Sequence, residues 1–335
     1  MLCRDMMTPR ERFISALERK PSKGSVPWWD LEFHLWDAFS DHRLILGEEF
    51  AALDAGRRSD ALKKNAAAFE QGTNEIPFSA ITLPTRFWNW APGQLAYFIL
   101  PEDDRFAQLQ AVKERVGTKV ALVASGGGPV MSANYDPDFC EKLFDEPEAI
   151  DREVEQRICE GIEVAKRWRD VGADALFCAA DIADNAGPFF NPAQMERWII
   201  PPMERWATAV KEMGMKPILH SDGDLAGYLE RIAATGISAL QAIDPVAGME
   251  LTASLAKVRG KMALVGNLDC GLLITGTPDA VEETALAMLH EHGEKPGWIF
   301  GASNAVQQEV PRENIRAVIR AVNRHAKLAQ TGVDV

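Results

Sequence analysis

A histidine and two aspartates stand close together after a short apolar stretch in the second half of the chain. His220 ends the apolar run 217–220, and Asp222 and Asp224 follow it. Imidazole and carboxylate groups at this spacing can bind a metal ion or transfer a proton. A lone histidine is more often a hydrogen-bonded structural residue, but the segment 220–224, His-Ser-Asp-Gly-Asp, is too polar for a buried core. We therefore interpret His220 and Asp222 as catalytic residues.

Polar residues recur in the same way after other apolar runs. They are Asp181, Asp184 and Asn185, then Gln241 and Asp244, then Asn267, Asp269 and Cys270, and finally Ser303 and Asn304. Any one of these acids could instead cap a helix or hold a turn. Independent caps need not recur after successive runs, so we expect Asp181 to be a third catalytic residue. We expect the substrate to contact Asp184, Gln241, Asn267, Asp269 and Asn304.

Aromatic residues cluster in the first quarter of the chain. They are Trp28, Trp29, Phe33 and Trp36, followed by Phe87, Trp88 and Trp90. Such rings can wall an apolar substrate pocket, and they pack equally well in an ordinary core. In the first case they would remove water from nearby acids and raise their pKa values. We predict that Trp28, Trp29 and Phe33 contact the substrate.

The elements that position these residues follow a regular order. From residue 119 onward, short apolar runs alternate with longer segments of helical period. The strand candidates are 120–124, 175–179, 217–220, 239–243, 263–266 and 298–301, with earlier ones at 25–30, 76–83 and 95–100. The helix candidates are 138–170, 192–214, 225–235, 249–259, 278–292 and 311–328. Repeated strand-then-helix order predicts parallel strands covered by helices.

The fold class that fits this order is α/β, a (β/α)8 barrel with an N-terminal helical extension. The extension is a helix starting at the capping box Thr8-Pro-Arg-Glu11. A doubly wound sheet also alternates, but the only glycine-rich turn, 125–128, lacks a nucleotide-binding pattern and is better read as a close-packed turn. In a barrel, the polar residues listed above converge on the C-terminal rim, where active sites lie.

Length and charge narrow the class of protein. The chain of 335 residues is compatible with one barrel domain over 1–335, and its net charge of −13 argues against nucleic-acid and membrane-surface partners. No apolar run is long enough to span a bilayer. The five cysteines are scattered, without a CxxC pair, so neither a disulfide framework nor a zinc knuckle is expected. We expect a cytoplasmic protein, and the sequence leaves open whether it forms a homodimer.

Several motifs spread over nearly the whole chain resemble those of the uroporphyrinogen decarboxylase superfamily, which includes corrinoid-dependent methyltransferases. They are Met7–Phe13, Val26–Trp28, Asp145–Glu148, Phe190–Pro192, Ile200–Pro202, Leu219–Gly223, Gly266–Asp269, Gly276–Pro278 and Val310–Ile315. The resemblance implies the barrel fold. It is less specific for the reaction, because the superfamily contains both lyases and transferases.

The chain departs from both branches of the superfamily. True decarboxylases carry an arginine-rich stretch after the first strand, whereas 29–34 contains no arginine. They also have a histidine-containing loop after the last strand, where this chain has Gly301-Ala-Ser-Asn304. The methyltransferases bind zinc through His-x-Cys and a later Cys. When these positions are matched to this chain, the histidine is His220, the first cysteine is replaced by Asp222 and the second cysteine is replaced by Asn304.

The resemblance therefore implies a methyltransferase closer to the corrinoid-dependent branch than to the decarboxylases. Zinc would be bound by His220, Asp222 and Cys270, and such a sulfur-poor site suits an oxygen substrate better than a thiol. A methyl group would move between a small donor, such as a methyl ether, and a corrinoid supplied by a partner protein. Two alternatives stay open, namely a decarboxylase acting on a different carboxylate and a non-catalytic barrel that binds a small molecule.

Overall fold

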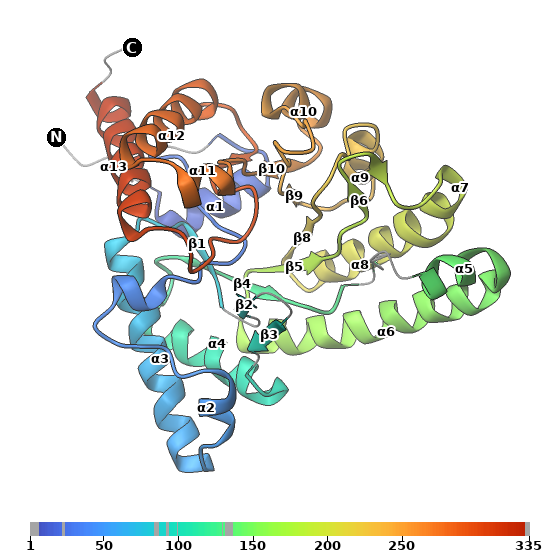
Figure 1. The fold of residues 1–335 in the computed structure, drawn as a ribbon, viewed down its shortest axis with the longest axis horizontal. Coiled ribbons are helices and arrows are strands. Elements are labelled where there is room, and N and C mark those ends of the chain that lie inside the picture. The colour runs from blue at the N-terminus through green and yellow to red at the C-terminus, as the bar shows by residue number, and fades with distance from the viewer. Residues whose placement is uncertain are drawn as a thin grey trace.

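A parallel sheet surrounded by helices forms the centre of the molecule (Figure 1). The structure is a computed structural model that describes residues 7–21, 24–83, 87–91, 94–98, 100–128, 130 and 137–331. Within these residues, neighbouring strands of the sheet pair in the order β1 (Ala80–Thr82), β4 (Ala121–Ser125), β5 (Ala175–Ala179), β8 (Lys216–His220), β9 (Ala239–Gln241), β10 (Ala263–Val265) and β11 (Trp298–Ile299). Every pair is parallel, as the alternation of strands and helices predicts.

The segment 27–29 closes this sheet into a barrel. Trp28 forms a parallel bridge with Phe300, and the Trp29 amide donates to the Phe300 carbonyl at 2.9 Å. On the other side, the Ser79 amide donates to the Trp28 carbonyl at 2.8 Å. The segment thus lies between β11 and β1 and occupies the eighth strand position. The predicted (β/α)8 barrel is confirmed, although the predicted first strand 25–30 is only a short bridging stretch.

Helix α1 (Pro9–Leu17) covers the amino-terminal end of the barrel. Its residues Phe13 and Leu17 are fully buried in one cluster with the residues that fill the barrel interior, including Trp29 and Phe177. A salt bridge of 2.6 Å joins Arg10 to Asp174, just before β5. The predicted capping box, in which the Thr8 hydroxyl and the Glu11 carboxylate each accept from the other's backbone amide, is present. This confirms the N-terminal helical extension.

The remaining helices lie outside the barrel sheet. They are α2 (Gly47–Ala51), α3 (Ala55–Glu75), α4 (Glu102–Val116), α5 (Pro137–Asp145), α6 (Pro147–Val171), α7 (Pro192–Gln194), α8 (Ile200–Glu212), α9 (Leu229–Ala234), α10 (Leu251–Val258), α11 (Cys270–Thr275), α12 (Pro278–His292) and α13 (Arg312–Thr331). Of the described helices, none is long and apolar enough to cross a membrane.

Prolines divide two segments that were predicted as single helices. The predicted helix 138–170 is α5 followed by α6, and Pro147 begins the second one. The predicted helix 192–214 contains a π-helical turn at Met195–Ile199 between α7 and α8. Pro201 and Pro202, which follow this turn, have no amide hydrogen to donate, so the regular hydrogen-bond ladder cannot continue through them.

Two extended regions lie outside the barrel sheet. The predicted strand 95–100 belongs to an antiparallel hairpin of β2 (Phe87–Ala91) and β3 (Gln94–Phe98). A smaller hairpin of β6 (Ala183–Asp184) and β7 (Gly187–Pro188) follows β5. The short 3-10 helix Trp36–Phe39 precedes α2.

The glycine turn after β4 is close-packed. A Cβ atom on Gly128 would lie 1.8 Å from the Cys178 sulfur at the end of β5. The turn therefore needs glycine for packing, as predicted, and its geometry gives no support to a nucleotide-binding role.

Candidate functional site

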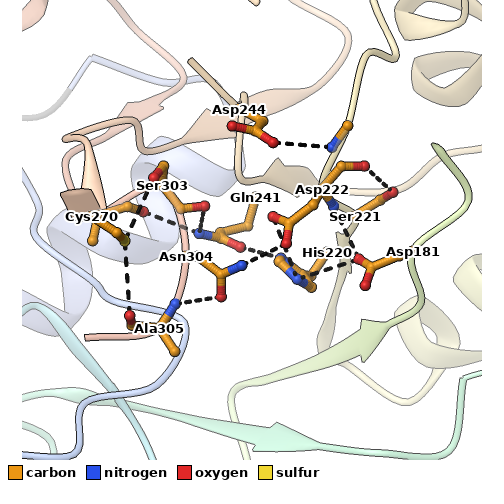
Figure 2. Close-up of polar contacts among 12 residues, drawn as sticks. Asp181, His220, Ser221, Asp222, Gln241, Asp244, Cys270, Ser303, Asn304 and Ala305 are labelled. Atoms are coloured by element: carbon orange, nitrogen blue, oxygen red, sulfur yellow. Dashed lines mark hydrogen bonds and ion pairs between the residues drawn. The ribbon is translucent and has the colours of Figure 1, made fainter. Parts of the chain in front are cut away.

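The carboxyl end of β8 carries the histidine predicted to be catalytic. In the sheet, His220 pairs with Ala179 of β5 and Gln241 of β9, so its side chain lies at the C-terminal rim of the barrel. Its Nε2 lies 3.7 Å from an Asp181 carboxylate oxygen and 4.0 Å from one of Asp222. Figure 2 shows these three side chains converging from the loops that follow β5 and β8. The structure thus brings together the three residues that were predicted to be catalytic.

Hydrogen bonds between two loops position the carboxylates. The Asp222 amide donates to Asp181 Oδ1 at 3.1 Å. The Ser221 hydroxyl accepts from the Ile182 amide at 3.1 Å and donates to the Asp222 carbonyl at 2.9 Å. Gly223 permits this close approach, because its φ is +90° and a Cβ there would lie 2.5 Å from the Ala183 carbonyl carbon. Hydrogen bonds therefore join the loop after β5 to the loop after β8 and hold the two carboxylates in place.

Asp222 sits in an environment that favours its protonated form. Burial raises the pKa of its carboxyl group to about 6, and the neighbouring charges of Asp181 and Asp244 act in the same direction. The positive charge available on His220 and a hydrogen bond from Asn304 partly oppose this rise in pKa. A carboxyl group with such a pKa can hold a proton near neutral pH and release it in a reaction.

The other ring nitrogen of His220 contacts a buried amide. His220 Nδ1 lies 2.5 Å from Gln241 Oε1, and Gln241 Nε2 donates to the carbonyls of Ala302 and Ser303 at 3.1 and 3.3 Å. Gln241 is fully buried. From the sequence we predicted that Gln241 binds substrate, but in the structure its amide is engaged with His220 and the backbone after β11.

The loop after β11 also contacts Asp222. Asn304 Nδ2 donates to Asp222 Oδ2 at 2.5 Å, and Asn304 Oδ1 accepts from the Ala305 amide (Figure 2). Asn304 therefore lies at the site, as predicted, with its amide turned toward the carboxylate.

Asp30 is a buried acid that sequence reasoning did not select. Its two carboxylate oxygens accept from the Ala302 amide at 2.8 Å and from Trp28 Nε1 at 3.0 Å. Burial raises the pKa of this carboxyl group to about 6, against the effect of both hydrogen bonds. Asp30 anchors the segment that carries Asn304. The only feature of the sequence that could have pointed to Asp30 is its position as an acid at the end of the strand candidate 25–30.

Three of the residues predicted to bind substrate have side chains that are hydrogen-bonded to the backbone. Asp269 caps α11 by accepting from the Leu272 amide at 2.8 Å. Asn267 donates to the Ile243 carbonyl, and Asp184 accepts from the Ala186 amide, both at 2.8 Å. For Asp269 and Asp184 these are the cap and turn contacts that were the alternative explanation for polar residues at strand ends, whereas Asn267 bonds to the backbone after β9.

Cys270 lies apart from the other predicted metal ligands. Its sulfur accepts from the Ser303 hydroxyl at 3.6 Å and lies 3.8 Å from the Ala305 carbonyl oxygen. Burial raises the pKa of its thiol, which favours the protonated form in the metal-free protein. Among the described residues, the potential ligands within 4.8 Å of one another are Asp181, His220 and Asp222. The structure therefore groups Asp181, and not Cys270, with His220 and Asp222, which corrects the predicted grouping.

The aromatic residues predicted to bind substrate are packed in the core. Trp28 is 2% exposed, Trp29 is 0% and Phe33 is 4%. Trp28 packs edge-on against Phe78, while Trp29 fills the barrel interior. These large apolar rings gain more from burial beside the closing strand than from lining a wall open to ligand, so their prediction as substrate contacts is corrected. The side chains of Phe87, Trp88 and Trp90 lie outside the described residues.

Comparisons with known proteins agree with this architecture. The family model for uroporphyrinogen decarboxylase (URO-D) matches residues 105–325. A protein from Syntrophotalea carbinolica named uroporphyrinogen decarboxylase is 25% identical over 229 residues, 64% of this chain and 63% of that protein. A protein of the same name from Burkholderia mallei is 32% identical over 109 residues, 31% of this chain and 28% of that one. The matches thus span less than two thirds of these relatives.

Among solved structures, a methyltransferase from Methanosarcina mazei has the same fold. It superposes with a TM-score of 0.72, covering 95% of this chain and 99% of its own, at 17% sequence identity. At that identity, the likeness concerns the barrel and not the reaction.

Proposed function

Because the chain belongs to the uroporphyrinogen decarboxylase family, we propose that it is a barrel enzyme that moves a methyl group from a small donor to a corrinoid on a separate protein. The donor class that suits the site best is a methyl ether. The observation that carries this proposal is the convergence of Asp181, His220 and Asp222, whose ligand atoms lie within 4.8 Å of one another.

These residues fit a divalent cation. Two ligand atoms of a tetrahedral zinc ion, each about 2.0 to 2.1 Å from the metal, are about 3.3 Å apart. The distances from His220 Nε2 to Asp181 and Asp222, 3.7 and 4.0 Å, need only a small contraction to reach that value. Asp181, His220 and Asp222 would hold the ion. When bound, it would supply Lewis acidity to the oxygen of the donor.

The donor set favours an oxygen compound over a thiol. The two positions at which the methyltransferase branch has cysteines hold Asp222 and Asn304, which are hydrogen-bonded to each other. Imidazole and carboxylate are harder Lewis bases than thiolate. A metal ion bound by one imidazole and two carboxylates is therefore better matched to an oxygen ligand than to a thiol.

Asp222 has the central role in the proposed reaction. When the bond between the methyl carbon and the ether oxygen breaks, the electron pair stays on oxygen, and the leaving alkoxide or phenoxide needs a proton. With a cation bound, Asp222 would be a deprotonated ligand, and the Lewis acidity of the ion would stabilise the charge on the leaving oxygen in place of a proton. Without a cation, its pKa of about 6 allows Asp222 to donate that proton directly. Both routes require the Asp222 carboxyl group.

The test is metal analysis of the purified protein, followed by assay with a Co(I) corrinoid protein and methyl ethers. Wild type is compared with a double variant, His220→Ala with Asp222→Ala. Asp224→Asn is the matched control, because Asp224 is in the same loop and an asparagine can still accept from the Ala226 amide. About one zinc per wild-type and control chain, lost in the double variant, supports the proposal. If wild type, the double variant and the control all lack metal, the zinc-assisted mechanism is excluded.

A decarboxylase is the second candidate, favoured by the name of the curated relatives and by the raised pKa of Asp222. The neighbouring charges that act on the Asp222 carboxyl group are those of His220, Asp181 and Asp244, and the two carboxylates would repel a carboxylate substrate. Release of CO2 from a carboxylate substrate, without methyl transfer to the corrinoid, would favour this candidate. Ligand binding without turnover would favour a non-catalytic barrel.

A further inference from the structure

The side-chain amide of Gln241 has only one orientation that satisfies its neighbours. One end lies 3.1 Å from the Ala302 carbonyl oxygen and 3.3 Å from that of Ser303. Carbonyl oxygens only accept hydrogen bonds, so this end must be the NH2 group. The other end, 2.5 Å from His220 Nδ1, is therefore the amide oxygen, which also only accepts.

This orientation determines where the neutral imidazole carries its proton. A hydrogen bond to Gln241 Oε1 requires a proton on His220 Nδ1, which leaves a lone pair on Nε2. Nε2 is the atom that faces the carboxylates of Asp181 and Asp222. Neutral His220 therefore cannot donate to either carboxylate, whereas a cation between them would be bound by all three groups.

We propose that Gln241 is a positioning residue that holds His220 in the Nδ1-protonated tautomer, with Nε2 free to bind a cation. The inference deepens the proposed function and rests on it for the bound cation, but the tautomer is a property of the metal-free protein. Because Gln241 is fully buried, it acts through His220 and does not contact substrate.

One backbone segment links the orientation of the imidazole to that of the carboxylate. Gln241 is anchored on the carbonyls of Ala302 and Ser303, and the next residue, Asn304, donates to Asp222. The Ala302 amide is in turn held by buried Asp30. Partners of this kind fix the orientation of metal ligands and typically change metal affinity by about 10- to 100-fold when removed.

The direct test is NMR of the metal-free protein labelled with 15N in histidine. The chain has six histidines, and the His220→Asn variant assigns the signal of His220. At about pH 8, where an ordinary imidazole is neutral, we expect a proton on Nδ1 and an unprotonated Nε2 in wild type. A proton on Nε2 at this pH would overturn the inference.

Two variants and a matched control test the role of Gln241. Gln241→Met removes the acceptor at similar volume, so we expect the Nδ1–H form to lose its preference and cobalt(II) affinity to fall about 10- to 100-fold. Gln241→Glu keeps an acceptor toward Nδ1 and, in its protonated form, can donate to the Ala302 carbonyl in place of the amide, so it should retain the tautomer. Gln108→Met is the control, because Gln108 is a buried amide of α4, bonded to Asn65 and Leu62, outside the site. It should leave the tautomer and metal affinity unchanged.

The outcomes separate this inference from the proposed function. A wild-type Nδ1–H tautomer that is lost in Gln241→Met supports the inference even if no metal binds and the metal route fails. An unchanged tautomer in Gln241→Met would contradict it, even if metal and methyl transfer are observed. If Gln241→Met does not fold, the wild-type and Gln241→Glu spectra still decide, since both must show Nδ1–H.

Discussion

The side chains of the site differ in how much of each is exposed to solvent, and the exposed fraction falls from the carboxylates to the buried amide. Asp181 is 49% exposed and Asp222 is 35% exposed, whereas His220 is 7% exposed and Gln241 is fully buried. A ligand entering from the rim therefore meets the carboxylates first and the imidazole next. The buried amide remains out of reach and only orients the ring. Residues that act on a ligand and residues that hold them in place are thus separated by depth.

Asp181 is the best position at which to separate function from stability. Asp181→Asn keeps an acceptor for the Asp222 amide but removes the charge. Because the side chain is half-exposed, we expect the free energy of unfolding to change by less than about 0.5 kcal/mol. We expect metal affinity to fall at least about 10-fold, measured by zinc titration. Equal metal affinity in the variant and wild type would exclude Asp181 as a ligand.

Buried Asp30 should make stability depend on pH. Its pKa of about 6 lies above the ordinary carboxyl value of about 3.9, so between these pH values the folded state binds more protons than the unfolded state. The stabilising contribution is fully present below about pH 4 and is lost as the pH rises through about 6. Relative to Asp30→Asn, wild type should lose up to about 3 kcal/mol over this range.

Denaturant unfolding of both proteins at several pH values measures this difference. The Asp222 contribution is present in both chains and cancels. A difference between wild type and Asp30→Asn that stays constant from pH 4 to pH 7 would show that the Asp30 carboxyl group is not perturbed by burial.

At the scale of elements, the regular segments were predictable and the irregular contacts were not. Strand β5 and helix α12 have the predicted bounds, because apolar period and capping residues are local properties of the sequence. The contact of Gly223 with Ala183 depends on two loops after different strands, so no local pattern reports it. Asp181 was selected from the sequence as a catalytic residue, but its position beside His220 and Asp222 becomes visible only in the folded chain.

The approach of these two loops should depend on glycine. Gly223→Ala introduces a Cβ at positive φ and 2.5 Å from the Ala183 carbonyl carbon. Gly187→Ala is the matched control in the β6–β7 hairpin, since its φ is +123° and nothing lies within 4 Å of the added atom. The control should lose about 1 to 2 kcal/mol of unfolding free energy from backbone strain alone.

Gly223→Ala should lose about 1 to 3 kcal/mol more than this control, because the backbone must shift. It should also weaken zinc binding, since Asp222 is the adjacent residue. Calorimetric unfolding and metal titration of both variants provide the comparison. Equal effects in the two variants would mean that the loops can separate without cost.

At the scale of the whole molecule, the order of strands and helices and the family resemblance predicted the barrel, but not how it closes or how the aromatic residues pack. Alternating strands and helices indicate a parallel sheet, whereas the predicted strand 25–30 makes only bridging contacts, at 27–29, that no local pattern distinguishes from a full strand. Trp28 and Trp29 were predicted to line a pocket because aromatic residues of a core and aromatic residues of a pocket wall look the same in a sequence. Their position beside the closing stretch is a property of the assembled barrel.

The two ends of the barrel should be separable in experiment. Phe13 of α1 is fully buried at the amino-terminal end, where it packs edge-on against Trp29 with 5.8 Å between ring centroids. Phe13→Ala removes this packing and should lower the free energy of unfolding by about 3 to 5 kcal/mol. Ile14→Ala, on the same helix but only partly buried, should cost less.

Under conditions in which both proteins are folded, zinc affinity and the His220 tautomer should match wild type, because the site lies at the opposite rim. This division follows the general rule that the N-terminal face of a barrel serves stability and the C-terminal face serves function. Unfolding in denaturant and metal titration on the same samples measure both quantities. Loss of metal affinity in folded Phe13→Ala would show instead that α1 transmits its packing through the barrel interior to the site.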